Sequence, residues 1–152
     1  EAEAFLEHLA GGLNSGEYLL LGLDLQKDPN VIQNAYNDPH GITRAFNMNI
    51  INRIARELDI PLNPKHFTHH SYYDPADGAL YAYLISNTAQ KIPLPDKNQS
   101  LYFRKWEPVF VEISRKFTPH LIAEIAQNHG FNVVANYTDS REYFVNSLWQ
   151  KK

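Results

Sequence analysis

Residues 18–25 carry the sequence YLLLGLDL, an unbroken apolar run with the length of one β-strand. Such runs are typical of strands that are covered on both faces, as in parallel sheets flanked by helices. Residues 3–13 have apolar side chains at helical spacing, and the sequence GGLNSGE interrupts that pattern. A helix followed by a strand buried on both faces predicts an α/β fold.

Acidic residues follow this strand closely. Asp24 would lie at its C-terminal end, the edge at which open α/β sheets bind ligands. Asp28 before Pro29 also has the pattern of a helix N-cap followed by a first-turn proline, which needs no ligand. Both a binding site and a purely structural role are therefore open for this segment.

The middle of the chain, about 30–115, has the pattern of an α+β insertion. A short helix and a turn are expected at 31–41, and a longer helix from Asp38-Pro39 to about Leu58. The apolar stripe of the longer helix consists of Ile42, Phe46, Ile50 and Ile54. A β-hairpin with the turn DPADG is expected to follow, with strands at 66–74 and 79–88.

The remaining segments complete the expected order of elements. The sequences QKIPLP and SLYFRKW predict two further strands, the first with prolines that suit a sheet edge. Thr118-Pro119 predicts the start of a helix that ends at Gly130. The segments FNVVANYT and EYFVNSLW then predict a closing pair of strands.

The strand VFVEISRKF, 109–117, combines apolar side chains with a carboxylate and a hydroxyl. Alternation with a period of two predicts Val109, Val111 and Ile113 on one face, and Phe110, Glu112 and Ser114 on the other. A carboxylate beside a hydroxyl can hold a ring N–H or an ammonium by charge-assisted hydrogen bonds. A solvated face, with Glu112 paired to Arg115 or Lys116, is the alternative interpretation.

Two more hydroxyls, Tyr36 and Thr43, flank the turn before the long helix. They could hold the carboxylate or the amine of a small ligand. Equally, Tyr36 could be a half-buried aromatic and Thr43 a residue of the first helical turn. The residues alone therefore predict an α/β domain with a possible small-ligand pocket.

Composition excludes several classes of function. The net charge of −3 without a basic block makes nucleic acid an unexpected partner. No apolar run is long enough to cross a membrane. The chain has no cysteine, which excludes disulfides and thiolate metal sites and suits a reducing, cytoplasmic location. His69 and His70 are adjacent and would point to opposite faces of a strand, so we expect no metal site.

Nucleotide-binding loops are absent from the sequence, since neither GxGxxG nor GxxxxGK[ST] occurs. The chain also starts without methionine, and its first residues have no signal-peptide pattern. We interpret it as a piece of a longer protein.

Three segments together resemble one family, the histidine-specific, S-adenosylmethionine-dependent methyltransferases. They are LLLGLDLQKDPNVIQNAYNDPHGITRAFNMNIINRIARELD (19–59), YLISNTAQKIPL (83–94) and VEISRKF (111–117). The best-known members of the family trimethylate the α-amino group of histidine in ergothioneine biosynthesis. The resemblance runs along nearly the whole chain, which corresponds to the C-terminal half of such a protein.

This resemblance implies an organisation and a function. Residues 1–28 and 117–152 would be the C-terminal part of a Rossmann-like methyltransferase sheet, and residues 29–116 an inserted α+β substrate-binding lobe. The cofactor, S-adenosylmethionine, would bind mostly to residues upstream of this chain. The intact protein would methylate the α-amino group of histidine or a related amino acid, and the piece alone would be inactive. The alternative is a non-catalytic amino-acid-binding or interaction domain. No oligomeric state is predicted.

The resemblance also assigns substrate-binding residues, but no catalytic ones. Glu112 matches the acid that holds the substrate imidazole, and Ser114 matches its companion hydroxyl. Tyr36 and Thr43 match positions that hold the amino-acid end. Ala82 stands where histidine methyltransferases have a methionine against the ring, which implies room for a larger ring.

Overall fold

The computed structural model describes residues 2–95 and 98–152. Its contacts divide the chain into two compact units: unit 1, made of Glu1–Lys27 and Arg115–Lys152, and unit 2, made of Asp28–Ser114. The chain passes between them at 27/28 and 114/115, whereas the sequence predicts these junctions at 28/29 and 116/117. The roles expected for the two parts stay predictions.

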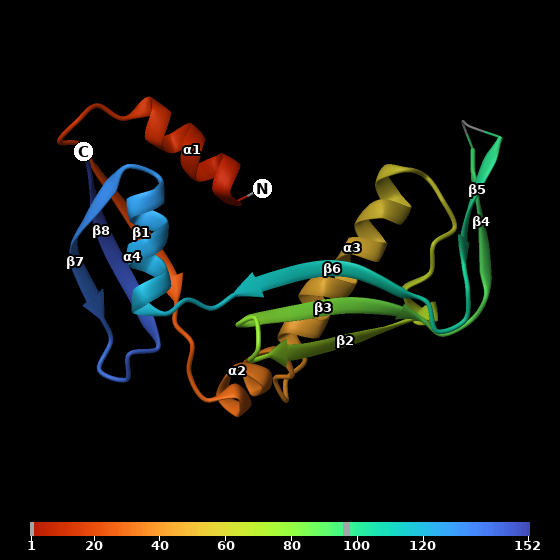
Figure 1. Cartoon of the computed structure of the whole chain (residues 1–152). Coiled ribbons are helices and arrows are strands. Elements are labelled where there is room, and N and C mark those ends of the chain that lie inside the picture. Colours follow the sequence, from red (N-terminus) through yellow and green to blue (C-terminus); the bar gives the residue numbers. More distant parts are fainter. Residues whose placement is uncertain (1, 96–97) are drawn as a thin grey trace. The chain divides into compact units, whose positions relative to one another are not determined.

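Unit 1 combines two helices with one sheet (Figure 1). Its elements are α1 (Ala2–Gly12), β1 (Tyr18–Asp24), α4 (Pro119–Asn128), β7 (Phe131–Thr138) and β8 (Phe144–Lys151). The strands pair antiparallel in the order β1-β8-β7. At the start of α4, the Thr118 side chain accepts a hydrogen bond from the Leu121 amide, as the Thr-Pro pattern predicts.

The expectation that β1 is buried on both faces is wrong for the described chain. Alternate β1 side chains pack with α1 and α4 around Trp149. The other face is open, since Tyr18 is 56% and Leu20 59% exposed. The physical reason is that both helices contribute to the same core, so only one face of this antiparallel sheet is covered.

Unit 2 places two helices against a second sheet (Figure 1). The helices are α2 (Pro29–Tyr36) and α3 (Ile42–Glu57), and the strands are β2 (Phe67–Asp74), β3 (Ala79–Ser86) and β6 (Pro108–Arg115). The strand order is β2-β3-β6, with β2 and β3 joined as the predicted hairpin. None of the helices among the described residues is long and apolar enough to cross a bilayer.

Smaller elements complete unit 2. A 3₁₀ turn, η1 (Pro64–His66), precedes β2, and β4 (Gln90–Leu94) pairs antiparallel with β5 (Gln99–Phe103) in a separate two-stranded sheet. The Asp28 side chain accepts a hydrogen bond from the Asn30 amide at the start of α2. The helix-cap interpretation of Asp28 is therefore confirmed.

The side chain of Gln33 ties α2 to the free edge of β2. It donates to the Ser71 carbonyl oxygen at 3.1 Å and accepts from the Tyr73 amide at 2.8 Å. These two bonds satisfy backbone groups that an edge strand otherwise leaves open. They fix α2 on one face of the sheet, called here the helix side.

The long helix α3 forms where expected but packs through a different face. Asn47 and Ile51 are buried, and Met48, Ile54 and Ala55 contact the core of unit 2. Most of the predicted stripe points outward, with Ile42 70% and Phe46 74% exposed. The helix has apolar residues on more than one face, and packing against Phe67 and Leu84 selects the face that is buried.

Candidate functional site

The strand β6 starts with regular alternation. Val111 packs into the helix-side core with Leu84. Phe110 lies against Tyr83 on the opposite face, with ring centroids 5.7 Å apart. Up to this point, the observed faces are those that the sequence predicts.

The alternation then shifts by one residue between Val111 and Glu112. Glu112 lines a hollow with residues of α3, and Ser114 is hydrogen-bonded to α2, so both lie on the helix side with Val111. Ile113 is 44% exposed. The prediction that Ile113 shares a face with Val111 is therefore wrong, because the side chains of the strand depart from strict alternation before Glu112. Glu112 and Ser114 do share a side.

Glu112 lies at a hollow of about 300 Å³ between α3 and β6. The other lining residues are Phe46, Asn47, Asn49, Ile50, Arg53 and Val111. The Oε2 atom of Glu112 is buried and has no hydrogen-bond partner among residues 2–95 and 98–152. A buried carboxylate oxygen without a donor costs free energy, so the arrangement suits a ligand that brings one.

Nearby cations do not neutralise Glu112. Arg53 lines the same hollow, but its Nε donates to Glu57 at 2.8 Å. The Lys116 ammonium lies 2.7 Å from an oxygen of Asp24. In the part of the chain that the structure describes, Glu112 forms no ion pair, so the alternative interpretation of a surface ion pair is wrong.

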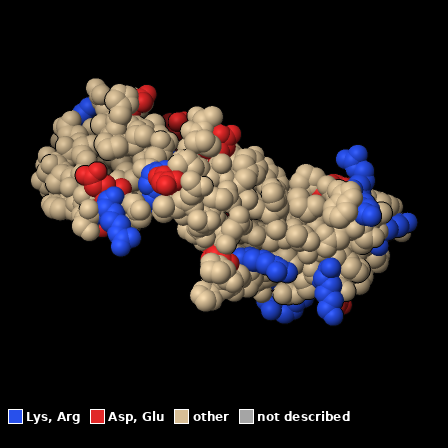
Figure 2. Space-filling view, turned by 90° about the horizontal axis from the view of Figure 1, so that it is seen from below, with Lys and Arg blue, Asp and Glu red and all other residues tan. Residues whose placement is uncertain are grey.

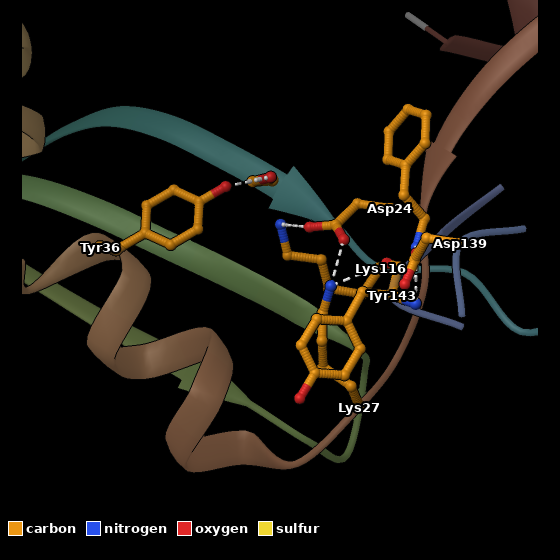
Figure 3. A network of polar contacts seen from close by, with 8 residues as sticks. Asp24, Lys27, Tyr36, Lys116, Asp139 and Tyr143 are labelled. Carbon is orange, nitrogen blue, oxygen red and sulfur yellow. Dashed lines mark hydrogen bonds and ion pairs between the residues drawn. The ribbon is translucent and has the colours of Figure 1, made fainter. Parts of the chain in front are cut away.

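Ser114 and Tyr36 are in direct contact, which the sequence did not predict, and their roles in substrate binding stay predictions. The Tyr36 hydroxyl donates to Ser114 Oγ at 2.7 Å, and Figure 3 shows the Tyr36 ring extending from its helix. Tyr36 also lines a second hollow, of about 400 Å³, with Asn37, Asp38, Pro39, His40, Gly41, Arg44 and His69. Tyr36 thus joins Ser114 to a hollow with polar lining residues.

Thr43 lies in the first turn of α3, and its side chain is not brought to Ser114. Its amide donates to Asp38 Oδ1 at 3.0 Å, and its hydroxyl is 3.5 Å from the Ala35 carbonyl oxygen. Asp38 also accepts from the Ile42 amide at 2.9 Å. These amides, that of Ile42 first, lower the pKa of Asp38.

Ala82 is fully buried in β3, opposite Ser71 of β2. It belongs to the set of β3 side chains that includes Leu84, so it faces the helix side. A methionine there would point toward the same layer as Glu112. The role of Ala82 in choosing a ring size stays a prediction.

The sequence interpretation missed a polar pair at the same layer. The Nδ2 atom of Asn47, a residue only 6% exposed, lies 3.2 Å from His69 Nε2. Burial chiefly lowers the pKa of His69, and the nearby charge of Glu112 opposes this change. The sequence could have indicated that His69 faces the interior, because His69 shares its strand face with the buried residues Phe67 and Ser71.

A second unpredicted cluster lies in unit 1, at the end of β1. The Asp24 carboxylate binds Lys27 at 2.5 Å through one oxygen and Lys116 at 2.7 Å through the other (Figure 3). Lys27 also donates to the Tyr143 carbonyl oxygen at 2.8 Å. Asp24 therefore holds two lysines, and nothing in this geometry favours the ligand role that its position suggested.

Three glycines of unit 1 border open space. A Cβ added to Gly11, Gly12 or Gly16 would meet nothing within 4 Å, whereas one added to Gly22 would meet the Phe144 ring. Residues 2–95 and 98–152 contain no group of three or more His, Cys, Asp or Glu side chains that could hold a metal ion.

Charge is spread thinly over the surface. On the face in Figure 2, Lys and Arg side chains occur singly or in small groups, several of them beside Asp or Glu side chains.

Comparison with known proteins identifies the class as methyltransferase. A model of the family described as histidine-specific, SAM-dependent methyltransferases matches residues 1–151. The chain belongs to this family, as its motifs indicate.

Two curated relatives are named histidine N-alpha-methyltransferase, and a third is named for ergothioneine biosynthesis. The histidine N-alpha-methyltransferase of Mycobacterium tuberculosis (strain CDC 1551 / Oshkosh) is 31% identical over 97% of this chain and 46% of its own length. The enzyme of that name from Mycolicibacterium smegmatis (strain ATCC 700084 / mc(2)155) is 34% identical over 81% of this chain and 39% of its own. Ergothioneine biosynthesis protein 1 of Schizosaccharomyces pombe (strain 972 / ATCC 24843) is 28% identical over 90% of this chain and 18% of its own length. The chain thus spans less than half the length of these relatives.

Solved structures give only distant likenesses. An S-adenosylmethionine-dependent methyltransferase from Clostridium acetobutylicum ATCC 824 aligns with 98% of this chain and 50% of its own, at 9% identity and a TM-score of 0.38. The CcbJ methyltransferase from Streptomyces caelestis aligns with 57% of this chain and 34% of its own length, at 15% identity and a TM-score of 0.33. Neither is close enough to support a structural argument.

Proposed function

We propose that this chain is the C-terminal portion of an S-adenosylmethionine-dependent N-methyltransferase that acts on the α-amino group of histidine or a related amino acid. The observation that carries the proposal is the buried Glu112 Oε2, which has no donor among the described residues and lies at a hollow. A ring N–H of the substrate would supply the missing donor. Membership in the histidine-specific family agrees with such a ligand.

The other predicted residues complete the substrate site. Tyr36 and Ser114, already joined by a hydrogen bond, would present their hydroxyls to the polar part of the amino acid. Thr43, on the turn next to them, would contribute through the first turn of α3. Ala82 would leave room for a ring larger than imidazole.

For methyl transfer, the main task of these residues would be to orient the substrate. S-adenosylmethionine, bound by the whole protein, would supply the methyl group. The amine attacks in line, so its lone pair must be aimed at near-attack distance. Glu112 would fix the ring and thereby the direction of the amine. Since the family resemblance places most of the cofactor site upstream of this chain, we expect the 152-residue chain alone to be inactive. The cytoplasm remains the expected location, because a cysteine-free chain suits a reducing compartment.

The test uses the full-length protein that contains this chain and its Glu112→Gln variant. We expect the variant to bind L-histidine more weakly by about 1–3 kcal/mol, with unchanged affinity for S-adenosylmethionine, when both are measured by calorimetry. Glu124→Gln, which makes the same change on the exposed surface of α4, is the matched control. Equal L-histidine affinity in wild type and Glu112→Gln would remove Glu112 from the site.

The substrate is identified in the same protein by mass spectrometry after incubation with S-adenosylmethionine and all standard amino acids. Methylated histidine supports the proposal and shows that Ala82 tolerates imidazole. A methylated aromatic amino acid makes Ala82 the next residue to change. Binding of neither cofactor nor amino acid would instead favour a non-catalytic interaction domain.

A further inference from the structure

His69 connects the two hollows of the candidate site. It lines the hollow beside Tyr36, and its hydrogen-bond partner Asn47 lines the hollow at Glu112. His69 comes from β2, Asn47 from α3 and Glu112 from β6. The imidazole therefore belongs to the site without being one of the residues that the family resemblance assigns.

The contact favours one state of the ring. With Asn47 Nδ2 turned toward the ring, the amide nitrogen donates and His69 Nε2 accepts. This geometry corresponds to a neutral His69 with its proton on Nδ1. Because Asn47 is only 6% exposed, water cannot easily replace the imidazole as the acceptor of this bond.

We propose that His69 is a positioning residue for the Glu112 site, and that its protonation in acid weakens ligand binding. The inference rests on the proposed function. Neutral His69 holds Asn47 in place and leaves the Glu112 carboxylate available to the ligand. Protonated His69 can no longer accept from Asn47, and its positive charge attracts the carboxylate that the ligand needs.

The surroundings of His69 decide where the change occurs. Burial lowers its pKa most, Glu112 on β6 raises it, and His70 on β2 and Arg44 on α3 lower it. Asp38, His40 and Tyr36 line the same hollow as His69. The net direction is downward from 6.5, so the ring is neutral at neutral pH and its protonation is expected below pH 6.5.

Ligand binding and protonation of His69 are thermodynamically coupled, so the effect can be measured through the affinity or through the pKa. A ligand donor at Glu112 removes the interaction that favours protonated His69, so binding must lower the pKa of His69 further. By the same amount, acid must weaken binding. A pKa change of about one unit corresponds to a tenfold loss of affinity.

The experiment uses the full-length protein with ¹⁵N-labelled histidine, in wild type, His69→Gln and Glu112→Gln forms. His66→Gln is the matched control, since His66 is exposed, lies in the same unit and does not act on His69. NMR of the ligand-free protein gives the tautomer and pKa of His69. Calorimetry gives L-histidine affinity at pH 7.5 and 5.5, and the ligand's own titration is common to all four proteins.

We expect the Nδ1-protonated tautomer of His69 in wild type, and a lower pKa of His69 in Glu112→Gln. Wild type and His66→Gln should each lose more affinity on acidification than His69→Gln, by up to about tenfold for a pKa change of one unit. An Nε2-protonated tautomer, or equal acid losses in wild type and His69→Gln, would overturn the proposal. If no form binds L-histidine, the proposed function fails separately. In that case the proposal for His69 is still tested by NMR. An unchanged pKa of His69 in Glu112→Gln would overturn the coupling between His69 and Glu112, and a lowered pKa would support it.

Discussion

Lys116 carries a charge on a side chain that is only 1% exposed. Its ammonium is 2.7 Å from one oxygen of Asp24, whose other oxygen binds Lys27. The Asp24 side chain is 36% exposed, so solvent screens part of this attraction. Without the carboxylate, the Lys116 ammonium would stay buried beside a second cation.

We expect Asp24→Asn to lower the free energy of unfolding of unit 1 by about 2 kcal/mol. The value lies below the roughly 3–5 kcal/mol of a fully buried broken pair, because Asp24 reaches solvent. Asparagine preserves the size of the side chain, so the change reports on charge. Chemical denaturation, with amide exchange in β7 and β8, measures the effect.

The control is Glu57→Gln, which breaks a surface pair of similar geometry. Arg53 Nε lies 2.8 Å from Glu57, and the two side chains are 65% and 51% exposed. Its loss should cost less than about 0.5 kcal/mol. Equal small effects of the two substitutions would show that Asp24 acts as an ordinary surface acid.

At this scale, the sequence could predict residue types but not long-range partners. Glu112 stood out because a carboxylate is unusual on an apolar strand, and its shared side with Ser114 was predictable from spacing. The change of face before Glu112 was not predictable, since it depends on how the strand packs against α2 and α3. The bonds of His69 with Asn47 and of Lys116 with Asp24 join different elements, which no local pattern specifies.

The start of α3 depends on one carboxylate. Asp38 accepts from the amides of Ile42 and Thr43, which otherwise have no partner within the helix. These hydrogen bonds favour the charged form and hold the pKa of Asp38 below 3.8. The capping group is also part of the hollow beside Tyr36.

We expect Asp38→Asn to remove a pH-dependent part of the stability of α3. A carboxyl group whose pKa is lower in the folded state stabilises above its unfolded pKa and loses that effect as pH falls through the folded pKa. Wild type should therefore exceed the variant in stability at neutral pH and approach it in acid, below 3.8. Amide exchange at Ile42 and Thr43 against pH measures this difference. A gap between the two proteins that is the same at every pH would contradict it.

Elements were easier to predict than the faces through which they pack. The helix α3 was expected at 39–58 and extends over Ile42–Glu57, because capping residues and spacing are local signals. Its buried face was not predictable, since several faces carry apolar residues and the choice depends on the sheet. Likewise, β1 has the composition of a strand buried on both faces but is covered on one.

Each unit of the molecule has its own hydrophobic core. In unit 1, Ile122, Phe131 and Trp149 belong to a cluster formed with α1 and β1. In unit 2, Leu84 and Phe67 pack with Ile51 of α3. The chain joins the units through only two passages, at 27/28 and 114/115. Two cores linked by so few covalent connections are able to open separately.

We therefore expect core substitutions to be felt in one unit at a time. Ile122 is 1% and Leu84 0% exposed, so Ile122→Ala and Leu84→Ala should each cost about 2–5 kcal/mol. Ile122→Ala should speed amide exchange in β7 and β8 and leave β2 and β3 unchanged, and Leu84→Ala should do the reverse. Each variant is the control for the other, because the change in volume is the same. If both variants accelerated exchange equally in both sheets, the two units would unfold as one cooperative body, and a ligand held in unit 2 would stabilise unit 1 as well.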